Sequence, residues 1–258
     1  MPRSLFYLLR NAAACLGLPA LLLAAPAALA QTAPPAPAQA GLNPYTGPRF
    51  PGGPDSLRAT LQRALRPAAG LTGQLFMQLE FDKTGRPNRF FLLAPLDRAS
   101  ATLARNKEVK AIVQQLPALL GSWQLTTTDG QTTKSIVLPL DFGSLPAPLL
   151  YSDENPAFFS FVAKRNSLPM SAANFIQRQF RYPVEDLRNH VEGTAYGYYE
   201  VSETGAVENR RIISGLSPTV DAELLRALNT LPDALTPPRQ QGRSVRVAYV
   251  VPVSLKIQ

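Results

Sequence analysis

The sequence predicts an α+β protein made of two tandem units, each with the order α-β-β-α-β and a small antiparallel sheet covered by helices on one face. Three observations support this. Residues 71–96 and 191–216 resemble each other at a constant spacing of 120 positions. An apolar stripe of helical spacing lies on either side of each copy, and each unit closes on a strand with alternating apolar residues. This order favours helices packed against an antiparallel sheet.

The repeat joins LTGQLFMQLEFDKTGRPNRFFLLAPL at 71–96 to VEGTAYGYYEVSETGAVENRRIISGL at 191–216. The matched positions are Gly73 and Gly193, Glu80 and Glu200, Thr84-Gly85 and Thr204-Gly205, Leu93 and Ile213, and Leu96 and Leu216. In both copies Thr-Gly stands where a hairpin has to turn, and glycine supplies the positive φ that such a turn demands. A duplication of this length predicts two homologous domains, at 49–142 and 169–258.

The second unit shows its elements clearly. The spacing predicts a helix over 172–181, strands over 194–201 and 207–214, a helix over 218–231 and a last strand over 243–256. Ser217 is expected to cap the second helix and Pro232 to end it. In the last strand, one face carries Val245, Val247, Tyr249, Val251, Val253 and Leu255, and the other carries Ser244, Arg246, Ser254 and Lys256.

The first unit repeats this order less regularly. A helix is marked by Leu57, Leu61 and Leu65, strands are expected at 73–81 and 89–93, and a last strand at 136–142. A second helix over 109–116 is expected to end at Pro117 and is preceded by an insertion. Pro139 falls in the last strand where Pro252 falls in the second unit.

Three further segments lie outside the two units. Residues 1–30 carry only Arg3 and Arg10 as charges, then an apolar run ending in Ala28-Leu29-Ala30, which predicts a secretory signal peptide and a periplasmic protein. An uncleaved membrane anchor is the alternative. Cys15 lies within the apolar run, so the mature chain has no cysteine and no disulfide. Residues 31–48 and 143–168 are proline-containing and are predicted to be linkers.

Charge and residue types exclude several functions. The net charge of +8 falls to +6 when Arg3 and Arg10 leave with the signal peptide, and the basic residues are scattered, so nucleic acid is not an expected partner. The one histidine, His190, has no cysteine to join it in a metal site and is read as a surface or helix-terminal residue. Asp153-Glu154 lie in a predicted linker, where they are expected to be solvated. No nucleophile, base and oxyanion donors come together, so we expect no enzyme and no cofactor.

The strand at 194–201 is rich in tyrosine. Tyr196 and Tyr198 share one face and Tyr199 lies on the other. Such tyrosines can form a binding patch, but packing within an aromatic strand is the more common outcome.

The ordered set of residues resembles the C-terminal domain of the TonB family. In the second unit the resemblance runs through Tyr182-Pro183, Val191-Glu192-Gly193-Thr194, Glu203-Thr204-Gly205, Val207, Ile212-Ile213, Gly215-Leu216, Asp221-Ala222, Leu231-Pro232, Gly242-Arg243, Val245-Arg246-Val247 and Pro252-Val253. In the first unit it rests on Arg49-Phe50-Pro51-Gly52-Gly53 with Leu57, and on Trp123, which the second unit lacks. The first unit also lacks the Tyr-Pro segment.

The resemblance implies a protein-binding module. TonB-like domains capture an extended peptide of an outer-membrane receptor along the edge of their last strand, where backbone hydrogen bonds give affinity and alternate side chains give selectivity. Carried over to this chain, the partner-binding residues are Arg243, Val245, Arg246, Val247, Ala248, Tyr249, Val250 and Val251. Pairing should weaken at Pro252, which has no N–H. Arg243, Arg246 and Lys256 have a second reading, as charges that protect the edge from unwanted pairing.

Two alternatives remain open at this point. The chain could be an energy-transducing TonB protein anchored by an uncleaved N-terminus, although its apolar run has no histidine or serine, and the spacer at 31–48 would reach only about 55 Å. The other alternative is structural: the two units, or two chains in a homodimer, would pair through their edge strands. The mature N-terminus and the solution mass discriminate among these readings.

Overall fold

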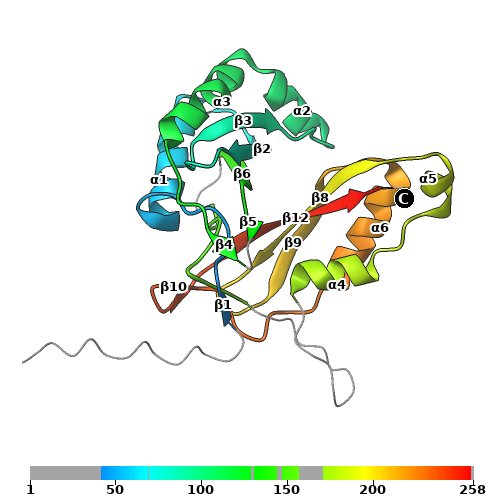
Figure 1. The fold of residues 1–258 in the computed structure, drawn as a ribbon. Helices are drawn as coiled ribbons and strands as arrows, with labels where there is room; N and C mark the ends of the chain where they lie inside the picture. The colour runs from blue at the N-terminus through cyan, green and yellow to red at the C-terminus, as the bar shows by residue number, and fades with distance from the viewer. Residues whose placement is uncertain (1–41, 69, 129–130, 144–146, 157–170, 257–258) are drawn as a thin grey trace, which may run out of the picture. The chain divides into compact units, whose positions relative to one another are not determined.

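The computed structural model describes residues 42–68, 70–128, 131–143, 147–156 and 171–256. These form an α+β protein, which confirms the predicted class. We call the part from α1 to β6 the first lobe and the part from α4 to β12 the second lobe (Figure 1).

The first lobe has one three-stranded antiparallel sheet in the order β3-β2-β6. Its elements are α1 (Gly53–Leu65), η1 (Arg66–Ala68), β2 (Gly73–Phe81), β3 (Pro87–Leu92), α2 (Arg98–Arg105), α3 (Lys107–Leu120), the short hairpin β4 (Thr127–Thr128) with β5 (Gln131–Thr132), and β6 (Ser135–Phe142). The insertion noted in the sequence is α2.

The second lobe has the same strand arrangement, in the order β12-β8-β9. Its elements are α4 (Ala172–Gln179), α5 (Val184–Arg188), β8 (Gly193–Val201), β9 (Val207–Ser214), α6 (Pro218–Asn229) and β12 (Val247–Leu255). In both lobes the first strand is central, the second strand forms one edge and the last strand forms the other.

Side-chain caps stand at the starts of four of the six α-helices in the described part of the chain. The Ser217 hydroxyl accepts a hydrogen bond from the Val220 N–H at 3.1 Å, so the predicted cap of α6 is confirmed. The predicted stop at Pro117 is wrong, because α3 continues to Leu120. Leu116 and Leu120 are both buried in the core of the first lobe, and this packing outweighs the hydrogen bond that the proline removes.

The two predicted linkers are partly folded, which corrects their assignment. A four-stranded sheet in the order β1-β7-β10-β11 is made of β1 (Leu42–Pro44), β7 (Glu154–Pro156), β10 (Arg239–Gln240) and β11 (Arg243–Ser244). Tyr151 is almost fully buried in the core of the first lobe. Pro44 and Pro156 stand at the ends of β1 and β7, where a missing N–H costs little.

Each lobe has its own core between helices and sheet, and a third cluster joins the two sheets. This cluster contains Phe76 and Leu93 of the first lobe and Tyr198, Ile213 and Ala248 of the second. The Phe76 and Tyr198 rings meet edge to face with centroids 5.5 Å apart. The Tyr196 hydroxyl donates a hydrogen bond to Gln78 Oε1 at 2.7 Å.

The two lobes therefore contact each other through the sheet faces that their helices leave uncovered. The sequence predicted helices on one face of each sheet, and the structure shows that the opposite face contacts the other lobe. This contact differs from the structural alternative, in which the two units pair through their edges. Tyr196 and Tyr198 lie on this shared face and Tyr199 lies in the core of the second lobe, as the alternation predicted.

Candidate functional site

The last strand of the second lobe, β12, forms one edge of its sheet. It pairs with β8 in an unbroken antiparallel register from Val247 to Leu255. The Ala248 N–H donates to the Leu149 carbonyl at 2.8 Å, so this N–H points away from β8. Because the direction of backbone groups alternates along an edge strand, Val250, Pro252 and Ser254 also direct their N–H or C=O groups outward.

The chain itself covers the beginning of this edge. Leu149 forms a parallel bridge to Val247: its N–H donates to the Arg246 carbonyl at 3.0 Å, and its carbonyl accepts from Ala248. Leu149 is buried. The outward groups nearest the start of β12 are therefore already paired.

The first residues of the predicted binding strand lie before β12. Arg243 belongs to β11 and pairs with Gln240 of β10. The Val245 N–H donates to the Pro238 carbonyl at 3.0 Å. The predicted strand over 243–256 is thus divided, because the chain turns back on itself in the β10–β11 hairpin before it joins the sheet of the second lobe.

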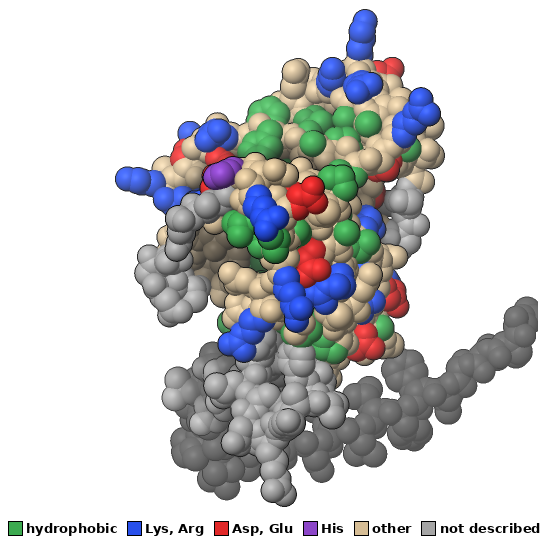
Figure 2. Space-filling model, turned by 90° about the vertical axis from the view of Figure 1, so that its right-hand side faces the viewer, with side chains coloured by type: hydrophobic (Ala, Val, Ile, Leu, Met, Phe, Trp, Pro, Cys, Tyr) green, Lys and Arg blue, Asp and Glu red, His purple; other side chains and the backbone are tan. Residues whose placement is uncertain are grey.

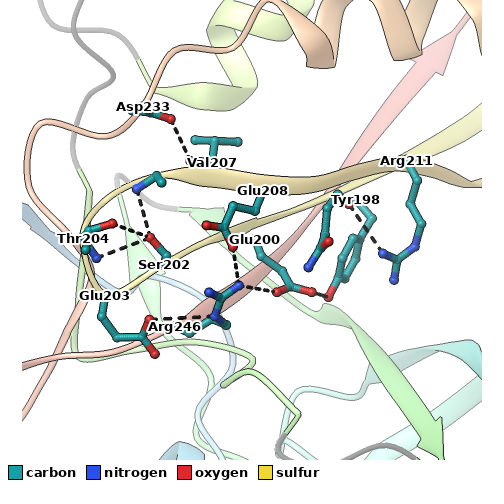
Figure 3. A network of polar contacts seen from close by, with 12 residues as sticks. Tyr198, Glu200, Ser202, Glu203, Thr204, Val207, Glu208, Arg211, Asp233 and Arg246 are labelled. Carbon is teal, nitrogen blue, oxygen red and sulfur yellow. Dashed lines mark hydrogen bonds and ion pairs between the residues drawn. The ribbon is translucent and has the colours of Figure 1, made fainter.

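The Arg246 side chain holds a cluster of carboxylates (Figure 3). Its Nη1 lies 2.7 Å from Glu208 Oε2 and 3.1 Å from Glu200 Oε2, and its Nε lies 3.8 Å from Glu203 Oε2. The hydrogen bonds to Glu208 and Glu200 raise the pKa of the guanidinium. Arg246 thus compensates the charge of Glu200, which is only 7% exposed, and this role is separate from contact with a partner.

Beyond Ala248, the outer edge of β12 has backbone groups that no other strand pairs with among the described residues. In the described part of the chain, no segment bonds to the outward backbone groups of Val250, Pro252 and Ser254. Pro252 lacks an N–H, so its ring occupies a position where no donor is lost from the ladder with β8. The available donors on this stretch are the N–H groups of Val250 and Ser254.

This open stretch borders a groove of about 580 Å³. The groove is lined by Val250, Pro252 and Ser254 of β12, and also by residues of β6, the corresponding edge strand of the first lobe. Its volume is within the usual range for ligand sites.

Tyrosines line part of the groove. Tyr45 stacks on Tyr151 with centroids 4.5 Å apart, and Tyr199 stacks on Tyr249 at 5.2 Å. The Tyr249 hydroxyl donates to Asn155 Oδ1 at 2.8 Å. Burial is the main cause that raises the pKa of all four phenols, so they stay uncharged at neutral pH.

Sequence reasoning missed several of these residues. Tyr45, Leu149 and Tyr151 lie in the stretches predicted to be linkers, and nothing in their spacing indicated burial. The wall provided by β6 could have been suspected from Pro139, because a proline inside a strand marks an edge. Of the predicted binding residues, the structure brings Ala248, Tyr249, Val250 and Val251 to the groove, and not Arg243, Val245, Arg246 or Val247.

Among the described residues, no three His, Cys, Asp or Glu side chains gather so that they could hold a metal ion. His190 is exposed at the end of α5. Lysine and arginine side chains are scattered over the visible face of the molecule, with acidic side chains between them (Figure 2).

The membrane and export predictions concern mainly the N-terminal segment. None of the helices in the described ranges combines the length and the apolar character needed to span a bilayer. The predicted signal peptide at 1–30, Cys15 and the spacer up to residue 41 lie outside the described residues.

The chain was compared with known proteins. No family model and no curated protein matches it. Among solved structures, it is similar to a solution structure of the TonB C-terminal domain of Helicobacter pylori, with 19% identity and a TM-score of 0.26 over 34% of this chain and 79% of that one. A shorter form of the same domain gives 16% identity and a TM-score of 0.24 over 33% of this chain and 91% of that one.

Proposed function

We propose that this protein is a periplasmic, TonB-like protein-binding module that recognises an extended peptide by adding it as a strand to β12. The observation that carries the proposal is the unpaired outer edge of Val250–Ser254, which borders a groove instead of a covering segment among the described residues. An extended peptide is the ligand whose backbone matches such an edge.

The edge favours pairing over a short stretch only. Leu149 occupies the start of β12, and Pro252 offers a carbonyl but no N–H. A partner strand would therefore bond mainly to Val250 and Ser254, and the rest of its affinity has to come from side chains in the groove.

The partner we propose is a segment of an outer-membrane receptor or of another envelope protein. The resemblance of the sequence to the TonB family supports this choice, together with the predicted export signal at 1–30. The mass of the mature protein separates this proposal from a membrane-anchored energy transducer, because only the anchored protein keeps residues 1–30.

Backbone amide hydrogen exchange tests the proposal. The chain would be measured alone and with a blocked extended peptide, with β9 as internal control because it forms the opposite edge of the same sheet. We expect new protection at Val250 and Ser254 and none at β9. Full protection of Val250 and Ser254 before peptide is added, with no change afterwards, would contradict the proposal, because the edge would already be occupied.

A further inference from the structure

We infer that the partner segment carries uncharged side chains and is held between the two lobes, with its backbone on β12 and alternate side chains against β6 of the first lobe. This inference rests on the proposed function and names the chemistry of its ligand. It assigns to the first lobe a direct part in recognition.

The outer edge of β6 can be identified from the direction of its backbone groups. The Phe81 N–H donates to the Lys134 carbonyl at 2.8 Å, so even-numbered residues of this strand face β2. Ser135, Val137 and Pro139 therefore direct their backbone outward. Pro139 thus has the same place on its edge as Pro252 has on β12.

The two edges border one groove. Val137 and Val250 both pack on the cluster that joins the two sheets. Ser135, Val137 and Pro139 line the groove together with Val250, Pro252 and Ser254. The last strands of the two lobes therefore form two walls of the same site.

The geometry of an added strand follows from the spacing of stacked sheets. Stacked sheets lie about 10 Å apart, so a strand bonded to β12 cannot also pair with β6. Its side chains alternate between two directions. One set points toward the other sheet, where Ser135 and Val137 lie, and the other points toward the start of α4, where Ser171 and Ala172 line the groove.

The groove differs from a second hollow in the charge of its lining residues. No Asp, Glu, Lys, Arg or His lies among the described residues that line this groove. A second hollow of similar volume, about 560 Å³, is lined by Asp55, Arg58, Asp141, Glu203 and Arg246 among others. The contrast shows that charged residues do line a comparable hollow on this molecule, and that the groove lacks them. A charged side chain entering it would lose water without gaining a partner.

Peptide binding to the full chain tests the inference. The probe is a short blocked peptide of alternating valine and threonine, and a second peptide has lysine in place of a central residue. We expect the lysine peptide to bind about tenfold more weakly, since its charge has no counterpart in the groove.

A charge on β6 should reduce this preference. Ser135 is exposed, so Ser135→Glu places a carboxylate on the wall without disturbing the core. We expect it to strengthen binding of the lysine peptide roughly threefold, the scale of an exposed ion pair, and to weaken binding of the neutral peptide. Ser122→Glu, at an exposed position that does not line the groove, is the matched control and should change neither affinity.

The outcomes separate the two proposals. If neither peptide binds or protects β12, the proposed function fails, and this inference fails with it. If the neutral peptide protects Val250 and Ser254 but the lysine peptide binds equally well, or if Ser135→Glu changes nothing, strand addition stands and this inference alone is overturned.

Discussion

The hairpin turns of the two lobes, at 82–86 and 202–206, are built in the same way from different residues. The Asp82 carboxylate accepts from the N–H groups of Thr84 and Arg86 in the first turn. The Ser202 hydroxyl accepts from those of Thr204 and Ala206 in the second. Either side chain provides the acceptor that such a turn needs, so the turn survives the exchange.

The residues that donate a hydrogen bond to each turn differ more between the two lobes. The Gly85 carbonyl accepts from the Trp123 N–H at 2.8 Å, and the Gly205 carbonyl accepts from the Ala234 N–H at the same distance. Trp123 is buried between the Phe50 and Phe81 rings, whereas Ala234 brings only a methyl group. A backbone contact is therefore common to the two lobes, while each core is filled by different side chains.

The largest loss of stability should follow from replacing Trp123, which has no counterpart in the second lobe. Trp123→Ala should lower the free energy of unfolding by about 3–5 kcal/mol, because it leaves a cavity between two rings. The indole Nε1 is buried without a hydrogen-bond partner, so no hydrogen bond of the indole is lost. Urea denaturation measures the change, with exposed Ser122→Ala as control. A loss below about 1 kcal/mol would mean that the tryptophan does not support this core.

The next largest loss of stability should follow from replacing the turn glycines, Gly85 and Gly205, which both lobes have. At Gly85 (φ 78°) a Cβ would lie 1.9 Å from the Trp123 carbonyl oxygen, and at Gly205 (φ 92°) a Cβ would lie 2.6 Å from that of Ala234. Alanine at either position should cost at least about 2 kcal/mol, and more at Gly85.

Two other glycines serve as controls for this pair. Gly121 and Gly242 also have positive φ, but a Cβ there would meet nothing within 4 Å. Alanine at these positions should cost only the backbone strain, about 1–3 kcal/mol, without the added cost of a close contact. Equal losses at all four positions, measured by thermal or urea unfolding, would show that the close backbone contact is not what selects glycine.

The smallest predicted change in stability depends on pH. Corresponding cross-strand pairs occupy the last strands: Gln74 donates to Asp141 in the first lobe, and Thr194 bonds to Ser254 in the second. Burial raises the pKa of Asp141, although Gln74 and Arg211 oppose the shift. The folded state therefore holds this proton more tightly than the unfolded state, so the carboxylate costs stability above the raised pKa and the cost disappears as pH falls through it.

Asp141→Asn should thus stabilise the chain at neutral pH by up to about 1 kcal/mol, and the gain should vanish in acid. Unfolding measured across pH checks this, and Ser254→Ala should show no comparable pH dependence. A variant that is less stable at neutral pH would mean that the hydrogen bond from Gln74 outweighs the cost of burying the charge.

The elements of each lobe could be predicted because they depend on local patterns. Leu57, Leu61 and Leu65 share a helix face in any packing, and all three are buried. Contacts that depend on a second, distant segment could not be predicted. Phe76 reads as the exposed side of an alternating strand, yet it is buried because the other sheet covers it.

The candidate site was found only in part for the same reason. The alternation predicted the last strand and the resemblance to the TonB family implied a site on it, but the bridge from Leu149 and the wall from β6 come from distant segments without a motif. Arg246 lay within the predicted site, and only the folded chain shows that Glu200 and Glu208 hold its side chain.

Peptide binding to Val250→Pro tests strand addition at β12. Proline at this position removes an outward N–H without breaking the ladder to β8, as Pro252 already shows two residues further along. Val250→Ala keeps the N–H and trims the side chain, so it is the matched control. We expect a folded Val250→Pro protein that has lost binding of an extended peptide, while Val250→Ala retains it. Equal binding by both variants would contradict strand addition at β12.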